Sequence, residues 1–203
     1  SKGKGGSMHF FDVEKKFMGG HAIVGGQIPL AVGLAFSQKY QNTNGLTVCY
    51  LGDGATNQGT YHESLNLAAL WKLPVLFILE NNMYGMGTAV NRVRASENDF
   101  YLDADKYGIP SYLVDGMDIL SVREASERAI EVIRSGKGPV LIEAKTFRFV
   151  GHSLADGEKY RDPGEITEWR KRDPIEKYPE LLLEHGIATK EELANIRELV
   201  DDD

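Results

Sequence analysis

Two short apolar runs in the first half of the chain are separated by a stretch with a different hydrophobic period. Residues 46–51 and 75–79 are continuous apolar runs, and each stops at a group of polar or glycine residues. Between them, residues 57–72 place apolar side chains at helical spacing, and Pro74 follows where that helix should end. The pattern predicts a strand, a helix and a second strand within residues 46–87.

The polar groups that follow the two predicted strands define one edge of a sheet. The first run is followed by Gly52-Asp53-Gly54 and the second by Glu80-Asn81-Asn82. A strand–helix–strand unit is right-handed and its strands are parallel, so both carboxyl ends lie at the same edge. Ligands bind outside that edge in open parallel sheets. We therefore expect Asp53 and Asn82 to converge on one point.

The rest of the chain continues the alternation of strands and helices. Residues 25–40 predict a helix with Pro29 in its first turn, and this helix is apolar nearly all round, which indicates burial. Further along, the pattern predicts a strand over 111–114, an amphipathic helix over 118–135 and a strand over 140–147. The predicted fold class is α/β, with a parallel sheet covered by helices on both faces.

Composition narrows the range of functions. The 203 residues carry a net charge of −7, which provides no general attraction to nucleic acid or anionic membranes. The single Cys49 lies in an apolar run and is predicted to be a small core residue. We expect one α/β domain over residues 1–203 that lacks N-terminal and C-terminal parts of a longer subunit, with a helical, acidic extension over 165–203. An intracellular enzyme fits these features, either in a bacterial cytoplasm or in the matrix or stroma of an organelle.

The two polar turns carry the residue types of a magnesium–diphosphate site. Mg²⁺ prefers oxygen ligands, which Asp53 offers as a carboxylate, Asn82 as an amide and Tyr84 as a backbone carbonyl. Gly52 and Gly54 allow a ligand to approach the backbone closely, and the N-terminus of the following helix favours a phosphate. The alternative is an ordinary strand–helix turn capped by Asp and Asn.

Several motifs in order resemble one family. The segments GDGATNQG and ENNMYGMG are similar to the diphosphate-binding motif of thiamine-diphosphate enzymes, in which GDG is followed further along by NN. The segments KGKGGSMH, GGHAIVGGQIPLAVGLA, NLAALWKLPV, VDGMDIL and FVGHS extend the likeness over roughly residues 1–175. Together they resemble the alpha subunit of the heteromeric pyruvate dehydrogenases, within the 2-oxo acid dehydrogenase family.

The resemblance implies a thiamine-diphosphate-binding fold, with thiamine diphosphate and Mg²⁺ as cofactors and pyruvate as the 2-oxo acid substrate. It also implies a beta subunit that completes the active site in an alpha/beta heterotetramer, and a lipoyl acyltransferase that receives the acetyl group. The implied metal ligands are Asp53, Asn82 and Tyr84. The implied cofactor-binding residues are Ala22, Ile23, Val24, Gly52, Asp53, Gly54, Ala55, Asn82, Tyr84, Gly85 and His152. Plain core packing is the alternative for Ile23.

Three residues are candidates for catalysis. His152 begins a polar loop just beyond the last predicted strand, and the resemblance places it in an active-site loop. His9, after the glycine-rich loop, matches a position near cofactor and substrate in the family. Glu63 matches a buried glutamate linked to proton communication between two cofactors. Ser153 matches a serine that is phosphorylated in regulated mitochondrial members, although the following segment, 154–157, is one residue shorter than the usual pattern.

Three other functions compete with pyruvate oxidation. The alpha subunit of acetoin dehydrogenase, or of another 2-oxo acid dehydrogenase, shares the same motifs. A nucleotide-binding α/β domain without decarboxylase chemistry is a different class. The chain lacks both a G-x-G-x-x-G segment opening a helix after a strand and a G-x-x-x-x-G-K-[ST] loop, which counts against dinucleotide or P-loop binding. A non-catalytic scaffold that retains only an assembly surface is the third.

Overall fold

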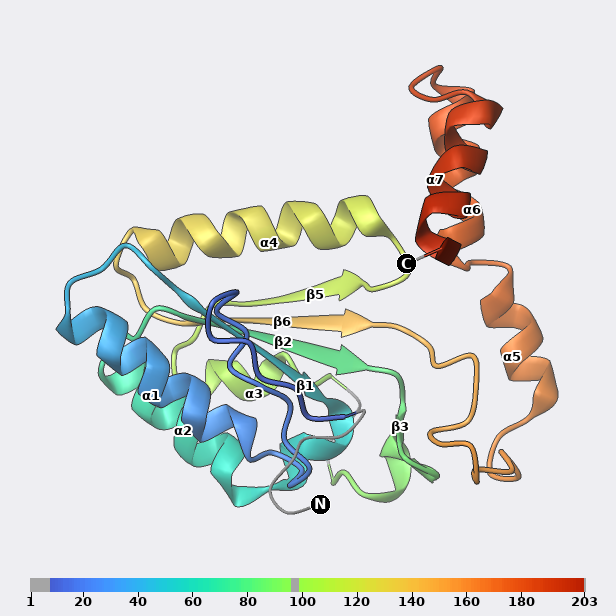
Figure 1. Cartoon of the computed structure of the whole chain (residues 1–203). Helices are drawn as coiled ribbons and strands as arrows, with labels where there is room; N and C mark the ends of the chain where they lie inside the picture. The colour runs from blue at the N-terminus through green and yellow to red at the C-terminus, as the bar shows by residue number, and fades with distance from the viewer. Residues whose placement is uncertain (1–7, 96–98, 203) are drawn as a thin grey trace, which may run out of the picture.

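The computed structural model describes residues 8–95 and 99–202. Its centre is a four-stranded sheet in the order β1-β2-β6-β5, in which every pair of neighbours is parallel (Figure 1). The strands are β1 (Thr47–Gly52), β2 (Val75–Asn81), β5 (Ser111–Asp115) and β6 (Val140–Lys145). The predicted strands therefore all form, within one or two residues at each end.

Helices cover both faces of the sheet. Helices α1 (Gln27–Tyr40) and α2 (Gly59–Leu70) pack on one face, and α4 (Ile119–Arg134) packs on the other (Figure 1). The α4 helix begins where the Asp118 side chain accepts hydrogen bonds from the backbone N–H groups of Leu120 and Ser121. The predicted α/β class with a parallel sheet between helical layers is confirmed.

The central strands are apolar because they are buried on both sides. In β2, the side chains of Val75, Phe77 and Leu79 join the core under α1 and α2, whereas Leu76 joins the core under α4. Such strands have continuous apolar runs rather than alternating ones. Cys49 is a buried core residue of β1, as predicted.

Helix α1 corrects one prediction. Its residues Ile28 and Ala35 are buried, but Leu30 and Phe36 are 52% and 47% exposed. The helix is therefore not buried all round: one face packs on β1 and α2, and the opposite face has no covering element among the described residues. Ile23, just before the helix, is 79% exposed, so core packing does not explain it.

Residues between β2 and β5 form small elements beside the carboxyl edge of the sheet. The strands β3 (Tyr84–Gly85) and β4 (Thr88–Ala89) pair as a short hairpin. A 3₁₀ turn and a one-turn helix follow, η2 (Val90–Arg92) and α3 (Leu102–Asp105). Residues 84–92 thus consist mainly of short regular elements.

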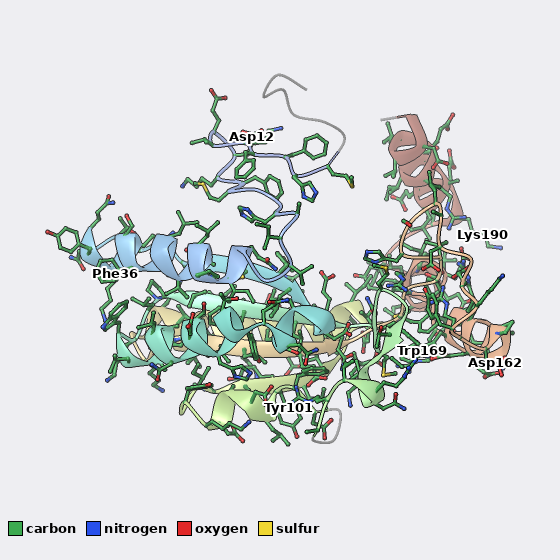
Figure 2. All side chains as sticks on the ribbon, turned by 90° about the horizontal axis from the view of Figure 1, so that it is seen from below. Asp12, Phe36, Tyr101, Asp162, Trp169 and Lys190 are labelled. Atoms are coloured by element: carbon green, nitrogen blue, oxygen red, sulfur yellow. The ribbon has the colours of Figure 1, made fainter. Side chains whose placement is uncertain are left out.

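The chain ends of the described region project from this core. Residues around Asp12 form a loop outside the α1 layer (Figure 2). The last part of the chain is helical, and no helix in the described ranges is both long and apolar enough to cross a membrane. Thr189 and Glu192 form a capping box, with the Thr189 backbone N–H donating to Glu192 Oε2 at 2.8 Å. The three helices are α5 (Pro163–Arg170), α6 (Pro174–Glu184) and α7 (Lys190–Asp202).

Candidate metal and cofactor site

The turns after β1 and β2 pack backbone against backbone. A Cβ atom added to Gly54 would lie 3.3 Å from the Cα atom of Gly85, and one added to Gly85 would lie 3.4 Å from the Cα atom of Gly54. Only glycine allows this approach without a shift of one turn. Asp53 begins a 3₁₀ turn, η1 (Asp53–Asn57), directly after β1, and Asn82 follows β2. The predicted convergence of the two turns is therefore present.

Asp53 is a buried carboxylate, with only 3% of its surface exposed. Burial raises its pKa, while hydrogen bonds from the backbone N–H groups of Asp53 and Asn82 and the charge of Arg148 lower it. Within the described ranges, no cationic nitrogen lies within 4.0 Å of its oxygens. A buried carboxylate without a direct counter-charge is costly, so this residue fits a bound cation.

The turn that carries Asn82 is held by two side-chain amides. Asn81 Oδ1 accepts a hydrogen bond from the Met83 backbone N–H at 3.0 Å, and Asn82 Oδ1 accepts one from the Tyr84 N–H at 3.1 Å. Met83 has a φ of 70°, which is uncommon for a residue with a side chain. The amide oxygen of Asn82 is thus fixed in orientation and retains a second lone pair for another partner.

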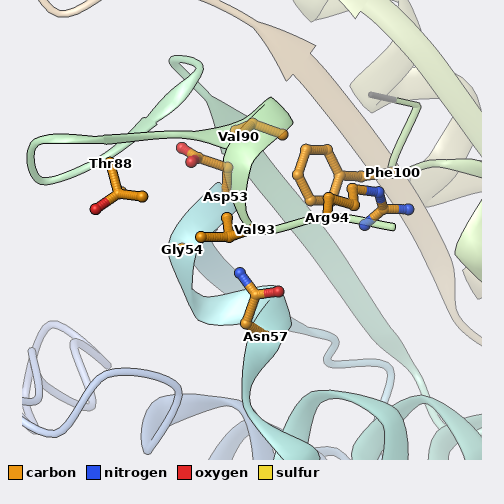
Figure 3. Close-up of a pocket in the computed structure, with 9 residues that line it drawn as sticks. Asp53, Gly54, Asn57, Thr88, Val90, Val93, Arg94 and Phe100 are labelled. Carbon is orange, nitrogen blue, oxygen red and sulfur yellow. The ribbon is translucent and has the colours of Figure 1, made fainter. Parts of the chain in front are cut away.

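A pocket of about 180 Å³ opens beside the Asp53 turn, between it and residues of the β3–β4 hairpin and the stretch that follows, and its lining includes neither Asn82 nor Tyr84. Figure 3 shows the Asp53 and Asn57 side chains on either side of Gly54, with Arg94 beside Phe100 on the far wall. Pockets that enclose a whole cofactor usually exceed about 300 Å³, so this pocket suits one end of a larger ligand. Its lining residues are Asp53, Gly54, Asn57, Gly85, Thr88, Val90, Val93, Arg94 and Phe100.

The loop after β6 lies against the β3–β4 hairpin through polar side chains. Arg148 Nη2 donates to the Met86 carbonyl at 2.8 Å and to the Tyr160 hydroxyl at 2.7 Å. The Tyr160 hydroxyl and the His152 backbone N–H both donate to Asp156 Oδ2, at 2.7 and 2.8 Å. These bonds lower the pKa of Asp156 to about 2. The network fixes His152 close to the hairpin, with its Nδ1 atom 3.5 Å from Arg148 Nη1.

Arg148 is a candidate functional residue that none of the sequence motifs indicates. Its charge acts on Asp53, and its side chain reaches both the hairpin and the loop that carries His152. One signal was available, because Arg148 is a basic residue just past the end of a strand at the predicted ligand edge. Asn57 and Arg94 were also missed as pocket residues, and Arg94 pairs with the buried Asp103 at 3.0 Å.

The predicted site residues do not all gather around Asp53. Gly52, Asp53, Gly54, Ala55, Asn82, Tyr84 and Gly85 belong to the two facing turns. Ala22, Ile23 and Val24 form an exposed loop, and the adjacent Gly25 lies against Gln58 at the start of α2, where an added Cβ would be 3.0 Å from Gln58 Cγ. That loop therefore lies near the same edge.

His9 and Glu63 lie outside this group of residues. His9 is exposed, with a φ of 65°, and the glycine-rich residues before Met8 lie outside the described ranges. Glu63 is exposed on α2, so the buried position implied by the resemblance is not present within this chain alone. Within the described residues, no hydrogen bond or ion pair joins either side chain to Asp53 or Asn82.

The profile of the family described as "Dehydrogenase E1 component" matches residues 1–203. The chain belongs to this family. It is 50% identical over 203 residues to a protein of Rhizobium meliloti (strain 1021) named "Pyruvate dehydrogenase E1 component subunit alpha", covering 100% of the chain and 58% of that protein. It is 49% identical over 205 residues to "Pyruvate dehydrogenase E1 component subunit alpha, mitochondrial" of Dictyostelium discoideum, covering 100% of the chain and 53% of the relative.

The chain is also 46% identical over 192 residues to "Pyruvate dehydrogenase E1 component subunit alpha" of Zymomonas mobilis subsp. mobilis (strain ATCC 31821 / ZM4 / CP4). The match covers 94% of the chain and 54% of that relative. The chain thus spans a little over half the length of these E1 proteins. The family resemblance inferred from the motifs is confirmed, whereas the roles of the individual site residues stay predictions.

Proposed function

We propose that this chain is the cofactor-anchoring part of a pyruvate dehydrogenase E1 alpha subunit. In this role it binds the diphosphate of thiamine diphosphate through Mg²⁺ at the meeting point of the β1 and β2 turns. The whole enzyme then decarboxylates pyruvate oxidatively and transfers the acetyl group to the lipoyl group of a partner acyltransferase. The names of the relatives support the choice of pyruvate.

The observation that carries the proposal is the buried Asp53 carboxylate facing the Asn82 turn. The carboxylate has no direct ion-pair partner among the described residues, and the neighbouring turn offers amide and carbonyl oxygens. Such a set of hard oxygen donors suits Mg²⁺, which in proteins usually keeps water and phosphate oxygens as its other ligands. A nucleotide-binding domain without a metal gives no reason for a buried carboxylate that lacks a direct ion-pair partner at this position.

Each group of the chain has a distinct task in this proposal. Asp53, Asn82 and the Tyr84 carbonyl hold the metal, and the Gly54–Gly85 contact lets the two turns share one ion. When bound, thiamine diphosphate supplies the electron sink that decarboxylation of a 2-oxo acid requires. His152, on its hydrogen-bonded loop, holds or transfers a proton at the acyl-transfer end of the site. His9 and Glu63 act from the side of the site that a beta subunit covers.

The small pocket supports a site completed by a second chain. The pocket suits only one end of the cofactor, and the residues proposed for the thiazolium end, Ala22, Ile23 and Val24, are exposed. We propose that the beta subunit covers this loop and the open face of α1 in an alpha/beta heterotetramer. We also propose that the protein acts inside the cell, in a bacterial cytoplasm or an organelle matrix or stroma.

The test is calorimetry on the full-length subunit assembled with its beta partner. We expect thiamine diphosphate to bind only when Mg²⁺ is present, and NAD and ATP not to bind. Turnover with ferricyanide as the electron acceptor should occur with pyruvate and not with acetoin. Binding of NAD or ATP in place of thiamine diphosphate would overturn the proposal, and turnover of acetoin alone would move the protein to the related acetoin enzymes.

A further inference from the structure

Strand β6 carries a glutamate in the middle of the sheet. Glu143 is 0% exposed, and it interrupts an otherwise apolar strand. Both of its oxygens accept hydrogen bonds: Oε1 from Asn81 Nδ2 at 2.7 Å and Oε2 from the Tyr101 backbone N–H at 2.8 Å. Lys145, the cation on the same strand, pairs instead with Asp99 at 3.1 Å. Glu143 is therefore held by one neutral N–H donor on each of its two oxygens.

One of these donors connects Glu143 to the Asn82 turn. Asn81 donates to Glu143 through Nδ2 and accepts from the Met83 N–H through Oδ1, so its amide lies between the carboxylate and the turn. The bond to Met83 holds a residue with a φ of 70°. This backbone conformation costs energy for a residue with a side chain, so it needs support from its surroundings.

The other donor connects Glu143 to the far wall of the pocket. Tyr101 follows Phe100, whose side chain lines the pocket, and its N–H is bonded to Glu143 Oε2. A single carboxylate therefore ties together the turn with the proposed metal ligands and the segment opposite it. The two segments are otherwise far apart in sequence and joined by the 83–99 stretch.

From this geometry we infer that Glu143 is a positioning residue, which acts through Asn81 to hold the Asn81–Gly85 turn in the conformation that binds the metal. The bracing of the turn stands on the hydrogen bonds alone, and its effect on metal affinity rests on the function proposed above. A turn that is ordered in advance avoids the ordering cost when the ion binds, which raises the apparent affinity.

The donor and acceptor pattern provides a sharp test by substitution. In Glu143→Gln, the side-chain NH₂ group must face either Asn81 Nδ2 or the Tyr101 N–H, so a donor meets a donor in a buried place. In the double variant Glu143→Gln/Asn81→Asp, the bond between the two side chains is restored with its direction reversed. The single variant Asn81→Asp is unfavourable, because it places two buried carboxylates in contact.

The experiment uses the full-length subunit assembled with its beta partner. Hydrogen exchange, measured by mass spectrometry on a peptide covering residues 81–87, reports the order of the turn. Calorimetric titration with Mg²⁺ in the presence of thiamine diphosphate reports the metal affinity. Glu80→Gln is the matched control, because it makes the same chemical change at an exposed carboxylate next to Asn81 and removes none of the bonds to Glu143.

We expect Glu143→Gln to raise the exchange rate of the turn and to weaken Mg²⁺ binding, each by about tenfold. The double variant should return both values to within about threefold of the parent, while Asn81→Asp alone should be at least as impaired as Glu143→Gln. Glu80→Gln should match the parent. A purely structural role for Glu143 would lower the melting temperature without this reciprocal rescue of metal affinity.

Two results would overturn the inference. If Glu143→Gln has the exchange rate and the Mg²⁺ affinity of the parent, Glu143 does not hold the turn. If exchange is faster but Mg²⁺ affinity is unchanged, Glu143 holds the turn without affecting metal binding. Failure of the proposed function is distinguishable, because the parent assembly would then bind no thiamine diphosphate. In that case the exchange measurement alone still decides whether Glu143 and Asn81 hold the turn.

Discussion

Two regions at the carboxyl edge of the sheet are held in place by different means. The turns after β1 and β2 are fixed by strand register, by the contact between Gly54 and Gly85, and by buried groups such as Asp53. The loop after β6 is buried only near its two ends, at Phe147 and Arg161, and residues 150–160 between them are exposed or partly exposed. Its order depends on the side-chain bonds of Arg148 and Asp156.

The difference indicates how the two regions should respond to a change in conditions. The geometry of the two turns is built into the fold, so it should persist until the sheet itself unfolds. The loop depends on hydrogen bonds that are exposed or only partly buried, so it should open locally at a smaller free-energy cost than unfolding of the sheet. A proposed metal site on a rigid edge therefore lies beside a proposed proton-transfer residue, His152, on an adjustable loop.

The largest effect should come from Asp53→Asn. We expect this change to weaken Mg²⁺-dependent binding of thiamine diphosphate by more than about a hundredfold, because an amide replaces the only carboxylate in the proposed ligand set. Burial raises the pKa of Asp53, which means that the folded state disfavours its charged form. At neutral pH, without metal, the variant should therefore melt at the same temperature as the parent or higher.

Calorimetry and thermal melting with and without Mg²⁺ check this separation of binding from folding. Asp105→Asn, which removes an exposed carboxylate from α3, is the control and should leave both values unchanged. If Asp53→Asn binds the cofactor as tightly as the parent, the metal assignment is wrong. If it lowers the melting temperature without metal, Asp53 has a structural role that the proposed site does not include.

A smaller effect is expected for Gly54→Ala, which tests the rigid side of the comparison. The added methyl would lie 3.3 Å from the backbone of Gly85, so the two turns must separate slightly. We expect about tenfold weaker cofactor binding and a loss of about 1 kcal/mol of folding free energy. Calorimetry and denaturant unfolding measure the two quantities.

Gly59→Ala in the first turn of α2 is the matched control for Gly54→Ala. A Cβ atom there meets nothing within 4 Å, and alanine favours the helix by about 0.5 kcal/mol. We expect unchanged cofactor binding and slightly higher stability. Equal behaviour of the two variants would show that the contact between the turns does not matter for binding.

The rigid region was largely predictable from the sequence, because its order follows from local patterns. The apolar runs of β1 and β2, the helix between them and the handedness of the connection together place Asp53 next to Asn82. No local sequence pattern predicts which atoms of the two turns are in contact. The sequence shows that Gly54 and Gly85 are permissive, but their mutual contact depends on the packing of two separate turns.

The loop and the helix surfaces were predicted less well for a related reason. The bonds among Arg148, Asp156 and Tyr160 join residues in a segment without periodicity, so no spacing rule indicates them. Helix α1 is apolar nearly all round, and this pattern does not distinguish a helix buried in its own core from one with a face left open. Glu143 gave a signal, a charge inside an apolar run, but its partner Asn81 lies on another strand.

The smallest effect should come from Asp156→Asn, which tests the adjustable side. Asp156 Oδ2 accepts from His152 and Tyr160, and Oδ1 accepts from the Glu158 N–H at 3.0 Å. Asparagine has one acceptor oxygen in place of two, so it can accept the bonds made to Oδ2 or the bond made to Oδ1, but not both. We expect a protease to cleave the loop a few-fold faster and the rate of acetyl transfer to fall a few-fold. The affinity for thiamine diphosphate should stay within about twofold of the parent value, because the two rigid turns are unchanged.

The pH dependence of the same group follows from its pKa of about 2 in the folded protein. An unfolded aspartate has a pKa of about 3.9, so the order that Asp156 gives the loop is fully present above about pH 4 and is lost as the pH falls through about 2. The side-chain carboxyl carbon of Asp156, followed by NMR, should therefore keep one chemical shift from neutral pH to about pH 4 and move below it. In Asp156→Asn this movement should be absent. If the chemical shift in the parent protein moves between about pH 5 and 8 instead, another titratable group controls the order of the loop. The assignment of Asp156 as the acceptor that orders the loop would then be wrong.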